Sequence, residues 1–525
     1  MLCTGFFMIV LDTTIVHIAI PTMVDSLRAS LDEILWVLNG YVLVYAVLLI
    51  TAGRLGDLYG QRNMFALGLL IFTAASAYCG FAPDVSHLQA ARVIQGVGGA
   101  LLTPQSLAIL TSIFPPDRRG AAFGVWGGVA GLGTVAGPTL GGYLVAEWGW
   151  RSIFFVNVPI GVLAMAATFL IIPDLRHGAR HRLDVVGVAL ATAGLFAIVF
   201  ALIEGERFQW GAIWGPVTIP VLIGAGALLL ALFILWERRQ AEPLMPLSLF
   251  ESRNFAIMNW IAVAVSFGMF GLFLPITIYM QSVLGLSALH AGLVTSPISL
   301  VSMVVAPMAG RFADRVGGKY ILFTGCLIVA AGFGSIALLA SPDAAPPRFV
   351  PSFAVAGLGM GLTFSPMATV AMRNVSPAMA GAASGVFNSF RQLGGVVGSS
   401  VVGAILQAQL ASALASRAIA AAGQLPAEAR QRFVEVFSQA GRSGLEVGPA
   451  QSARIPEGVP ADVAAQLQQL AHGVFTSAFV DAMRPSLAGP VMMLLIAALS
   501  TLLIERRRRA AAMPQETAEA LALAS

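Results

Sequence analysis

The sequence predicts an all-α integral membrane protein with 14 transmembrane helices. Three observations support this fold class. Hydrophobic residues make up 57% of the chain and charged residues only 11%, against about 25% charged residues in soluble domains. Apolar runs of about 20 residues, the length that a helix needs to cross a bilayer, recur along the whole chain. The short links between these runs alternate between many and few basic residues.

The 14 apolar runs follow one another with few interruptions. Their ranges are 1–21, 36–53, 64–82, 88–113, 121–146, 152–172, 185–204, 213–236, 254–281, 289–310, 319–341, 349–371, 380–411 and 486–504. Most links are short and contain Gly, Pro and Asp, which favour turns. One link, at about 412–480, is long and contains no run able to span a bilayer. We expect it to be an extracytoplasmic loop.

The basic residues predict the orientation of the helices. The short links after odd-numbered runs hold four of them, Arg28, Arg151, Arg207 and Arg348, whereas the alternate links and the tail hold eighteen. Cytoplasmic links of membrane proteins are enriched in Arg and Lys, so both termini are predicted to be cytoplasmic. The net charge of +4 then faces anionic lipid headgroups, and it gives no indication of nucleic acid binding.

Two links repeat the same pattern. The first reads G-R-L-G-D-L-Y-G-Q-R at 53–62 and the second G-R-F-A-D-R-V-G-G-K at 310–319. Besides an arginine, the shared positions are Gly53, Asp57, Gly60 and Arg62 in the first link and Gly310, Asp314, Gly317 and Lys319 in the second. A parallel repeat of this kind is typical of transporters, with the substrate site between the repeats.

The repeat predicts a division of the chain. Residues 1–172 form an N-terminal six-helix half, 173–253 two inserted helices, 254–504 a C-terminal six-helix half that includes the long loop, and 505–525 a basic cytoplasmic tail. We interpret the repeated links as a conformational latch, because an acid there can bond helix N-termini or basic residues of the other half. Solvated loop charges are the alternative interpretation.

Asp12 is a carboxylate in the middle of the first apolar run. A charge at the bilayer centre costs about 2.5–3.5 kcal/mol even on insertion scales, so acids inside spans are functional candidates. We interpret Asp12 as a proton carrier; a structural carboxylate bonded to a neighbouring helix is the alternative. His17, five residues further along, is rotated by about 140° from Asp12, and we expect it to provide a hydrogen bond rather than a second proton site.

Two cations also lie inside apolar runs. Arg92 precedes Gly96 and Gly99 by four and seven residues, which places all three on one face of a helix. An arginine that extends to the membrane surface is one interpretation, and the other is a role in proton coupling, which only the family resemblance described below implies. Arg391 has the same two interpretations, and the sequence favours neither.

These stretches resemble the major facilitator superfamily, and in particular its fourteen-helix drug/proton antiporter branch. The resemblance rests on the repeated link, on L-D-T-T-I-V-H-I-A-I-P around Asp12, and on G-x-x-x-G-P-x-x-G-G, formed by Gly133, Gly137, Pro138, Gly141 and Gly142. It implies a cavity-facing Asp12 that carries protons, coupling through Arg92, and export. His17 stands where this branch usually has Asn. Small-residue packing with a proline kink also explains the glycine motif in part.

The sequence therefore predicts a proton-coupled antiporter that exports amphiphilic small molecules by alternating access. Its expected partners are the substrate, protons and lipids, with the proton motive force and no cofactor, in the plasma (inner) membrane. An adaptor protein in the periplasm is expected if the host has an outer membrane. A proton symporter, a lipid or metabolite translocase, and a non-transporting sensor stay open. No enzyme is indicated, because the glycine-rich strings lie in apolar helices without a preceding strand.

The sequence also predicts the charge of the substrate. The ninth to thirteenth apolar runs, from 254–281 to 380–411, contain no Asp or Glu, so a dication would leave one charge unpaired in a medium of low dielectric. We expect neutral or singly charged substrates, with Met303, Met269 and Phe267 as candidate contacts that can equally belong to the core or face lipid.

Overall fold

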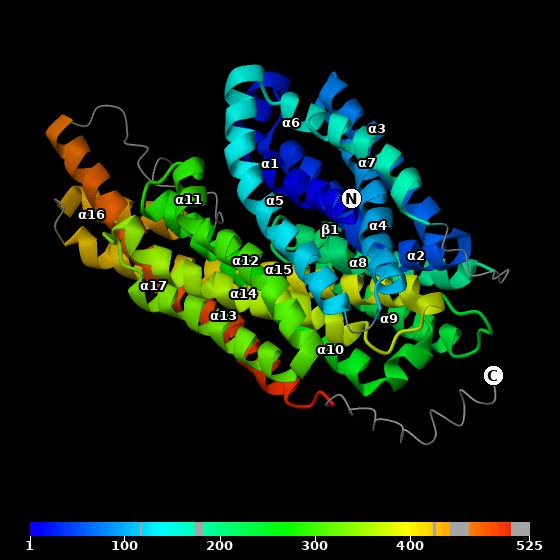
Figure 1. Cartoon of the computed structure of the whole chain (residues 1–525). Helices are drawn as coiled ribbons and strands as arrows, with labels where there is room; N and C mark the ends of the chain where they lie inside the picture. The colour runs from blue at the N-terminus through cyan, green and yellow to red at the C-terminus, as the bar shows by residue number, and fades with distance from the viewer. Residues whose placement is uncertain (116–117, 174–181, 424–426, 441–460, 506–525) are drawn as a thin grey trace, which may run out of the picture.

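The computed structural model describes residues 1–115, 118–173, 182–423, 427–440 and 461–505, almost all in helices (Figure 1). The first group comprises α1 (Leu2–Leu27), α2 (Leu31–Tyr59), α3 (Gln61–Phe81), α4 (Val85–Ile113), α5 (Arg119–Trp148), α6 (Ser152–Phe155) and α7 (Asn157–Ile171). The middle group comprises α8 (Val185–Glu204), the antiparallel strands β1 (Ala212–Trp214) and β2 (Val217–Thr218), and α9 (Ile219–Glu237).

The last group contains the longest helices. Its α-helices are α10 (Arg253–Ile278), α11 (Ala288–Thr295), α12 (Pro297–Val316), α13 (Lys319–Leu339), α14 (Val350–Ala371), α15 (Ala380–Ala422), α16 (Ala427–Ala440) and α17 (Ala461–Thr501). Its short helices are η1 (Leu247–Glu251), η2 (Tyr279–Val283), η3 (Pro346–Phe349) and η4 (Pro377–Met379).

The spans confirm the 14 apolar runs. Among the described residues, 13 helical segments are long and apolar enough to cross a membrane, and α5 makes the fourteenth although it bends by 41° between Thr134 and Thr139. The pairs α6–α7 and α11–α12 are each one run interrupted by a short break. The tail at 506–525 lies outside the described residues.

Side-chain caps define where several helices begin. Ser30 and Glu33 form a capping box at the start of α2, each side chain bonding the backbone of the other. Asp84 caps α4 by accepting from the backbone N–H of His87 at 2.9 Å. These bonds to His87 hold the pKa of Asp84 below its ordinary value, because they stabilise the carboxylate.

The first and last groups form two bundles inclined to each other (Figure 1). They meet where α2 packs on α15 and α5 packs on α12 and α14. The middle helices α8 and α9 pack on each other, and α8 also contacts α2 and α15. One hydrophobic core runs through this junction and includes residues of both bundles and of α8. The division of the chain at 173 and 253 stays a prediction.

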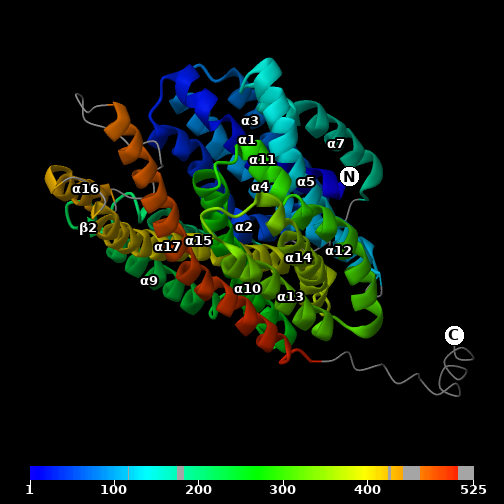
Figure 2. The same cartoon turned by 90° about the vertical axis from the view of Figure 1, so that its left-hand side faces the viewer.

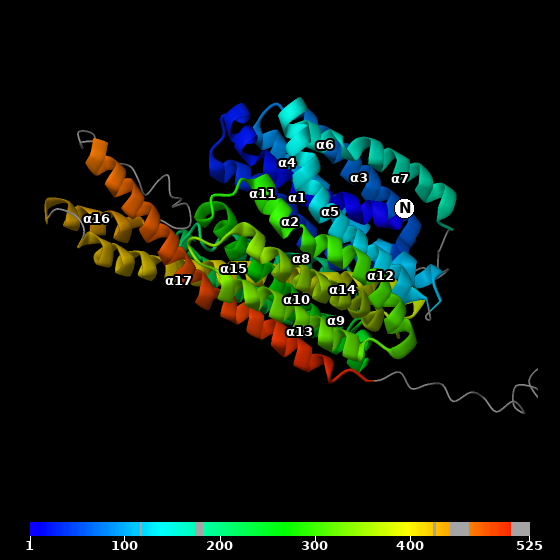
Figure 3. The same ribbon diagram turned by 60° about the vertical axis from the view of Figure 1, so that its left-hand side comes forward.

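The link at 412–480 is largely helical in its described part, and its extracytoplasmic position stays a prediction. Helix α15 continues to Ala422, α16 follows, and α17 begins at Ala461, so that these helices project from the body (Figures 2 and 3). Leu410 and Leu414 are buried with Phe437 in the hydrophobic core, and Arg417 on α15 pairs with Asp481 on α17 at 2.6 Å. An Ala-rich composition favours helices, and these contacts stabilise them. Residues 441–460 lie outside the described part.

Candidate functional site

Asp12 lies in a buried cluster of polar side chains inside the N-terminal bundle. Its Oδ2 accepts a hydrogen bond from Nη1 of Arg92 at 2.5 Å, and its Oδ1 accepts from Nε2 of Gln95 at 2.8 Å and from Nδ2 of Asn157 at 3.3 Å. The carboxylate is 0% exposed. Four helices therefore form one site. Asp12 lies on α1, Arg92 and Gln95 on α4 and Asn157 on α7, and α2 contributes the backbone carbonyl of Val37.

Arg92 is held by more than its counter-ion. Its Nε donates to the carbonyl oxygen of Val37 at 3.1 Å, and Nη1 also donates to Oε1 of Gln95 at 2.7 Å. The guanidinium lies 4.3 Å from the ring centroid of Tyr41, within the range of a cation–π contact. Arg92 is 1% exposed, so the interpretation of an arginine that extends to the membrane surface is wrong.

The glycines that follow Arg92 explain how α4 approaches α2. A methyl group at Gly96 would collide with the backbone of Tyr41, and one at Gly99 would touch its hydroxyl. The predicted shared face of Arg92, Gly96 and Gly99 is therefore the face packed on α2. This close packing brings the guanidinium within reach of both Val37 and Tyr41.

The ion pair determines what Asp12 can do in this conformation. A buried pair is tolerated because each charge neutralises the other and the remaining bonds are satisfied. Asp12 does not face a cavity here, in contrast to what the family resemblance implies. Both oxygens of the carboxylate already accept hydrogen bonds here, Oδ2 from Arg92 and Oδ1 from Gln95 and Asn157.

The acids of the repeated links bond across the two bundles. Asp57 on α2 accepts from the backbone N–H groups of Gly381 and Ala382, both at 2.8 Å, at the start of α15. Asp314 on α12 accepts from Gly120 and Ala121, at 2.9 and 3.1 Å, at the start of α5. Carboxylates are favoured at helix N-termini, where N–H groups lack partners.

The first glycine of each link permits this approach. A methyl group at Gly53 would collide with the carbonyl oxygen of Gly381, and one at Gly310 with that of Gly120. The later glycines instead permit the turn that follows the helix. Gly60 and Gly317 end α2 and α12 with φ of 92° and 88°, a region that residues with a side chain avoid.

The cations of the links bond within their own bundle. Arg62 donates to the carbonyl oxygen of Ile172, just after α7, at 3.3 Å. Lys319 donates to the carbonyl oxygens of Leu502 and Ile504, just after α17, at 2.6 and 3.2 Å. Cations are favoured at helix C-termini. Within each link, the acid therefore joins the bundles, while the cation fastens the last long helix of its own bundle.

The glycine motif of α5 packs this helix on α1. Added methyl groups at Gly137 and Gly141 would collide with α1 and one at Gly133 would touch it, whereas one at Gly142 would meet nothing within 4 Å. Pro138 falls within the interval where α5 bends. A different set of glycines on α5 faces α12: Gly120, Gly124, Gly128 and Gly131. The motif thus stabilises the N-terminal bundle, and these other glycines form the junction.

The model of the Major Facilitator Superfamily matches residues 2–399. The chain belongs to this family. The tetracenomycin C resistance and export protein of Streptomyces glaucescens is 36% identical over 407 residues, which cover 77% of this chain and 75% of that protein. The multidrug resistance protein Stp of Mycobacterium tuberculosis is 35% identical, with 78% and 75% covered. The probable actinorhodin transporter of Streptomyces coelicolor is 38% identical, with 77% and 71% covered.

Solved structures of the same superfamily share the fold. The human organic anion transporter MFSD10 aligns with a TM-score of 0.58 at 13% identity, covering 94% of this chain and 97% of that chain. The proton:xylose symporter XylE aligns with a TM-score of 0.52 at 15% identity, with 76% and 86% covered. This member of the superfamily is therefore a multi-pass membrane transporter and not an enzyme.

Three further candidates of this major facilitator protein are His17, Arg391 and Met269. His17 is exposed while Asp12 is buried, as expected for different faces of α1; its hydrogen-bonding role stays a prediction. Arg391 is half-buried and donates to Oδ1 of Asn388, one turn earlier on α15, at 3.2 Å. Met269 is 8% exposed and belongs to the hydrophobic core, so it is not available as a substrate contact in this conformation.

Sequence reasoning missed Gln95 and Asn157. Both are polar residues in apolar stretches, R-V-I-Q-G and F-F-V-N-V-P, and that signal could have singled them out as it did Asp12. Asn157 also donates to Oγ of Ser76 at 3.2 Å, which extends the cluster to α3. Arg119 was missed as well: it is buried, and its Nη1 donates to the carbonyl oxygen of Met372 across the bundles at 3.3 Å.

Proposed function

We propose that the protein is a proton-coupled antiporter that exports amphiphilic small molecules from the cytoplasm by alternating access. The observation that carries this proposal is the buried Asp12–Arg92 pair, a titratable group with an exchangeable partner inside a transporter. Intramembrane acids that face other helices typically mark ion pathways. Export as the direction is supported by the names of relatives that confer resistance or export antibiotics.

The conformation corresponds to one stage of this cycle. Asp57 and Asp314 hold the bundles together at the end that carries the repeated links, which is cytoplasmic if the distribution of basic residues sets the orientation. Substrate would leave at the opposite end while this end is closed. Because the two acids bond helix N-termini of the opposite bundle, they stabilise this state and must separate for the inward-facing state to form.

The proton step follows from the contacts of Asp12. When its carboxylate separates from Arg92, a proton from the outside can bind one of its oxygens. Arg92 keeps the carbonyl of Val37, Oε1 of Gln95 and the ring of Tyr41. One charge that crosses about 100 mV releases about 2.3 kcal/mol, which sustains a substrate gradient of roughly tens-fold.

The test uses purified protein in liposomes with an imposed pH gradient. A fluorescent monocation such as ethidium should move against the direction of the protons, and a protonophore should abolish its accumulation. The matched control is liposomes with the Asp12→Asn protein. Movement of substrate in the same direction as protons indicates a symporter, and uphill movement that ignores the pH gradient contradicts proton coupling.

A further inference from the structure

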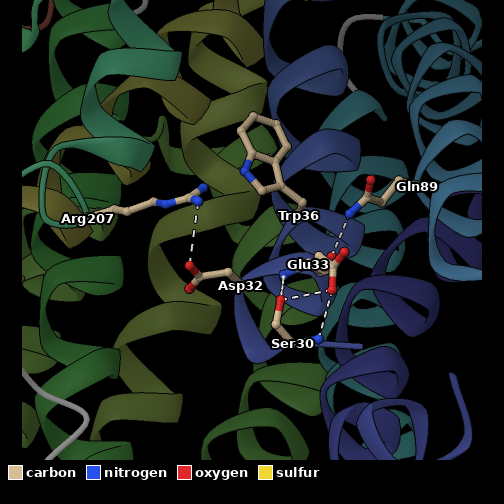
Figure 4. Close-up of a pocket in the computed structure, with 6 residues that line it drawn as sticks. All are labelled: Ser30, Asp32, Glu33, Trp36, Gln89 and Arg207. Carbon is tan, nitrogen blue, oxygen red and sulfur yellow. Dashed lines mark hydrogen bonds and ion pairs between the residues drawn. The ribbon is translucent and has the colours of Figure 1, made fainter. Parts of the chain in front are cut away.

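A cavity of about 550 Å³ opens at the end of the molecule opposite the repeated links. Its lining residues are Ser30, Asp32, Glu33 and Trp36 near the start of α2, Gln89 near the start of α4, and Arg207 after α8 (Figure 4). Small-molecule sites typically occupy about 300–1,000 Å³. None of these residues belongs to the Asp12 cluster or to the repeated links, so the cavity is separate from the machinery described above.

The wall formed by α2 and α4 is tied together by hydrogen bonds. The carboxylate of Glu33 accepts from the backbone N–H of Ser30 at 2.8 Å and from its hydroxyl at 2.9 Å. The side chain of Gln89 donates to the carbonyl oxygen of Glu33 at 2.7 Å. These bonds fix the start of α2 against α4. The carboxylate of Asp32 and the ring of Trp36, which both project from α2, therefore have a defined spacing.

Asp32 and Trp36 are four residues apart on α2, and therefore lie one above the other on one face. An acid one turn from an indole offers a cation both a counter-charge and an aromatic face. Trp36 is half-buried, and its ring lies 5.9 Å from that of Phe200 on α8. The indole is thus held at the contact between α2 and α8, with part of its surface open to the cavity.

A cation of the chain itself already occupies this position. Nη2 of Arg207 lies 3.5 Å from Oδ2 of Asp32, and its Nη1 lies 3.3 Å from Oε2 of the buried Glu204. Two carboxylates, those of Asp32 and Glu204, therefore share the single guanidinium of Arg207, while the carboxylate of Glu33 is bonded to Ser30. Asp32 and Arg207 are each about half exposed, so their pair is weak and can be exchanged.

We propose that this cavity binds a monocationic aromatic compound, with the positive charge at Asp32 and the ring on Trp36, in competition with Arg207. The guanidinium would turn towards Glu204 when the ligand enters, and would displace the ligand when it returns. Binding itself requires no transport. A role of this cavity as an exit site for transported substrate rests on the proposed function.

The test measures ethidium binding to the full-length protein in nanodiscs without any ion gradient, with empty nanodiscs as the blank. Trp36→Ala and Asp32→Asn should each raise the Kd by about tenfold, the effect of losing a cation–π or charge contact. Arg207→Gln should instead lower the Kd severalfold, since it removes the competing cation. Trp214→Ala is the matched control, because Trp214 lies in the same link but is 84% exposed and outside the cavity.

Opposite signs for Asp32→Asn and Arg207→Gln support the site. If both variants raise the Kd, the ion pair only maintains local structure and the proposal is overturned. An unchanged Kd in Trp36→Ala also overturns it. The same series in an Asp12→Asn background separates this proposal from the proposed function, because that variant should lose coupled efflux while binding in the cavity persists.

Discussion

The two bundles carry the same link but bury different charges. In both, an acid bonds the start of a helix in the other bundle and a cation bonds the end of a helix in its own. Inside the N-terminal bundle, however, Asp12 and Arg92 form a neutral buried pair. The five apolar runs of the C-terminal bundle between residues 254 and 411 contain no Asp or Glu, and within the last of them, 380–411, the one charged residue is the half-buried cation Arg391.

This difference separates two tasks that the fold must perform. The contacts that close one end of the molecule are duplicated, because each bundle has to release the other in the same movement. The proposed proton carrier, Asp12, accepts hydrogen bonds from Arg92, Gln95 and Asn157, which all belong to the N-terminal bundle. Substitutions in the links should therefore have paired effects, whereas substitutions at Asp12 should have no counterpart in the other bundle.

The largest effect is expected for Asp12→Asn. Uphill efflux in proteoliposomes should fall below detection. The variant should still insert, but it should be less stable to thermal unfolding by about 3–5 kcal/mol, because Arg92 loses its buried counter-ion. The double variant Asp12→Asn/Arg92→Gln should regain stability without regaining efflux. Asp25→Asn, an exposed acid on the same helix, is the control and should retain activity. Uphill efflux by Asp12→Asn would show that Asp12 is structural.

An intermediate effect is expected for substrate charge. The acid buried in the cluster is already paired with Arg92, and the apolar runs of the C-terminal bundle between residues 254 and 411 contain the cation Arg391 but no acid. A dication would keep at least one charge unpaired. Efflux of a dicationic quaternary amine should be at least about tenfold slower than that of a matched monocation, a difference of about 1.4 kcal/mol. Equal rates for the two compounds, measured side by side, would refute this expectation.

A smaller and paired effect is expected for the links. Asp57→Asn and Asp314→Asn should each slow exchange by about tenfold and by similar factors, since each removes a charged acceptor of two N–H groups. Substrate affinity, measured by equilibrium binding, should change little. Arg62→Gln and Lys319→Gln are the controls: they act within one bundle and should lower stability by about 1 kcal/mol or less with nearly normal exchange. A large loss of affinity in the acid variants, or equal effects of acids and cations on exchange, would contradict the assignment.

Much of the fold could be predicted because the bilayer imposes a length on each helix. Apolar runs of about 20 residues predicted the 14 spans, and only the helical ends shifted. The helices within the link at 412–480 were not predicted, because a helix that does not span a bilayer need not be apolar throughout. Leu410 and Leu414 are four residues apart, but only their burial in one core with Phe437, where α15 packs on α16 and α17, shows that this segment is helical.

The sequence by itself determined which groups are costly to bury and which links are repeated. Asp12, Arg92, Asp57 and Asp314 follow from charge in an apolar setting and from similarity between two stretches. Only the tertiary structure decided their partners. Gln95 and Asn157 reach Asp12 because α4 and α7 converge on α1, and Asp57 meets Gly381 across 324 residues of chain. Hydrogen bonds act over about 3 Å, so a partner is defined by which helices pack together, and no spacing along the chain encodes that.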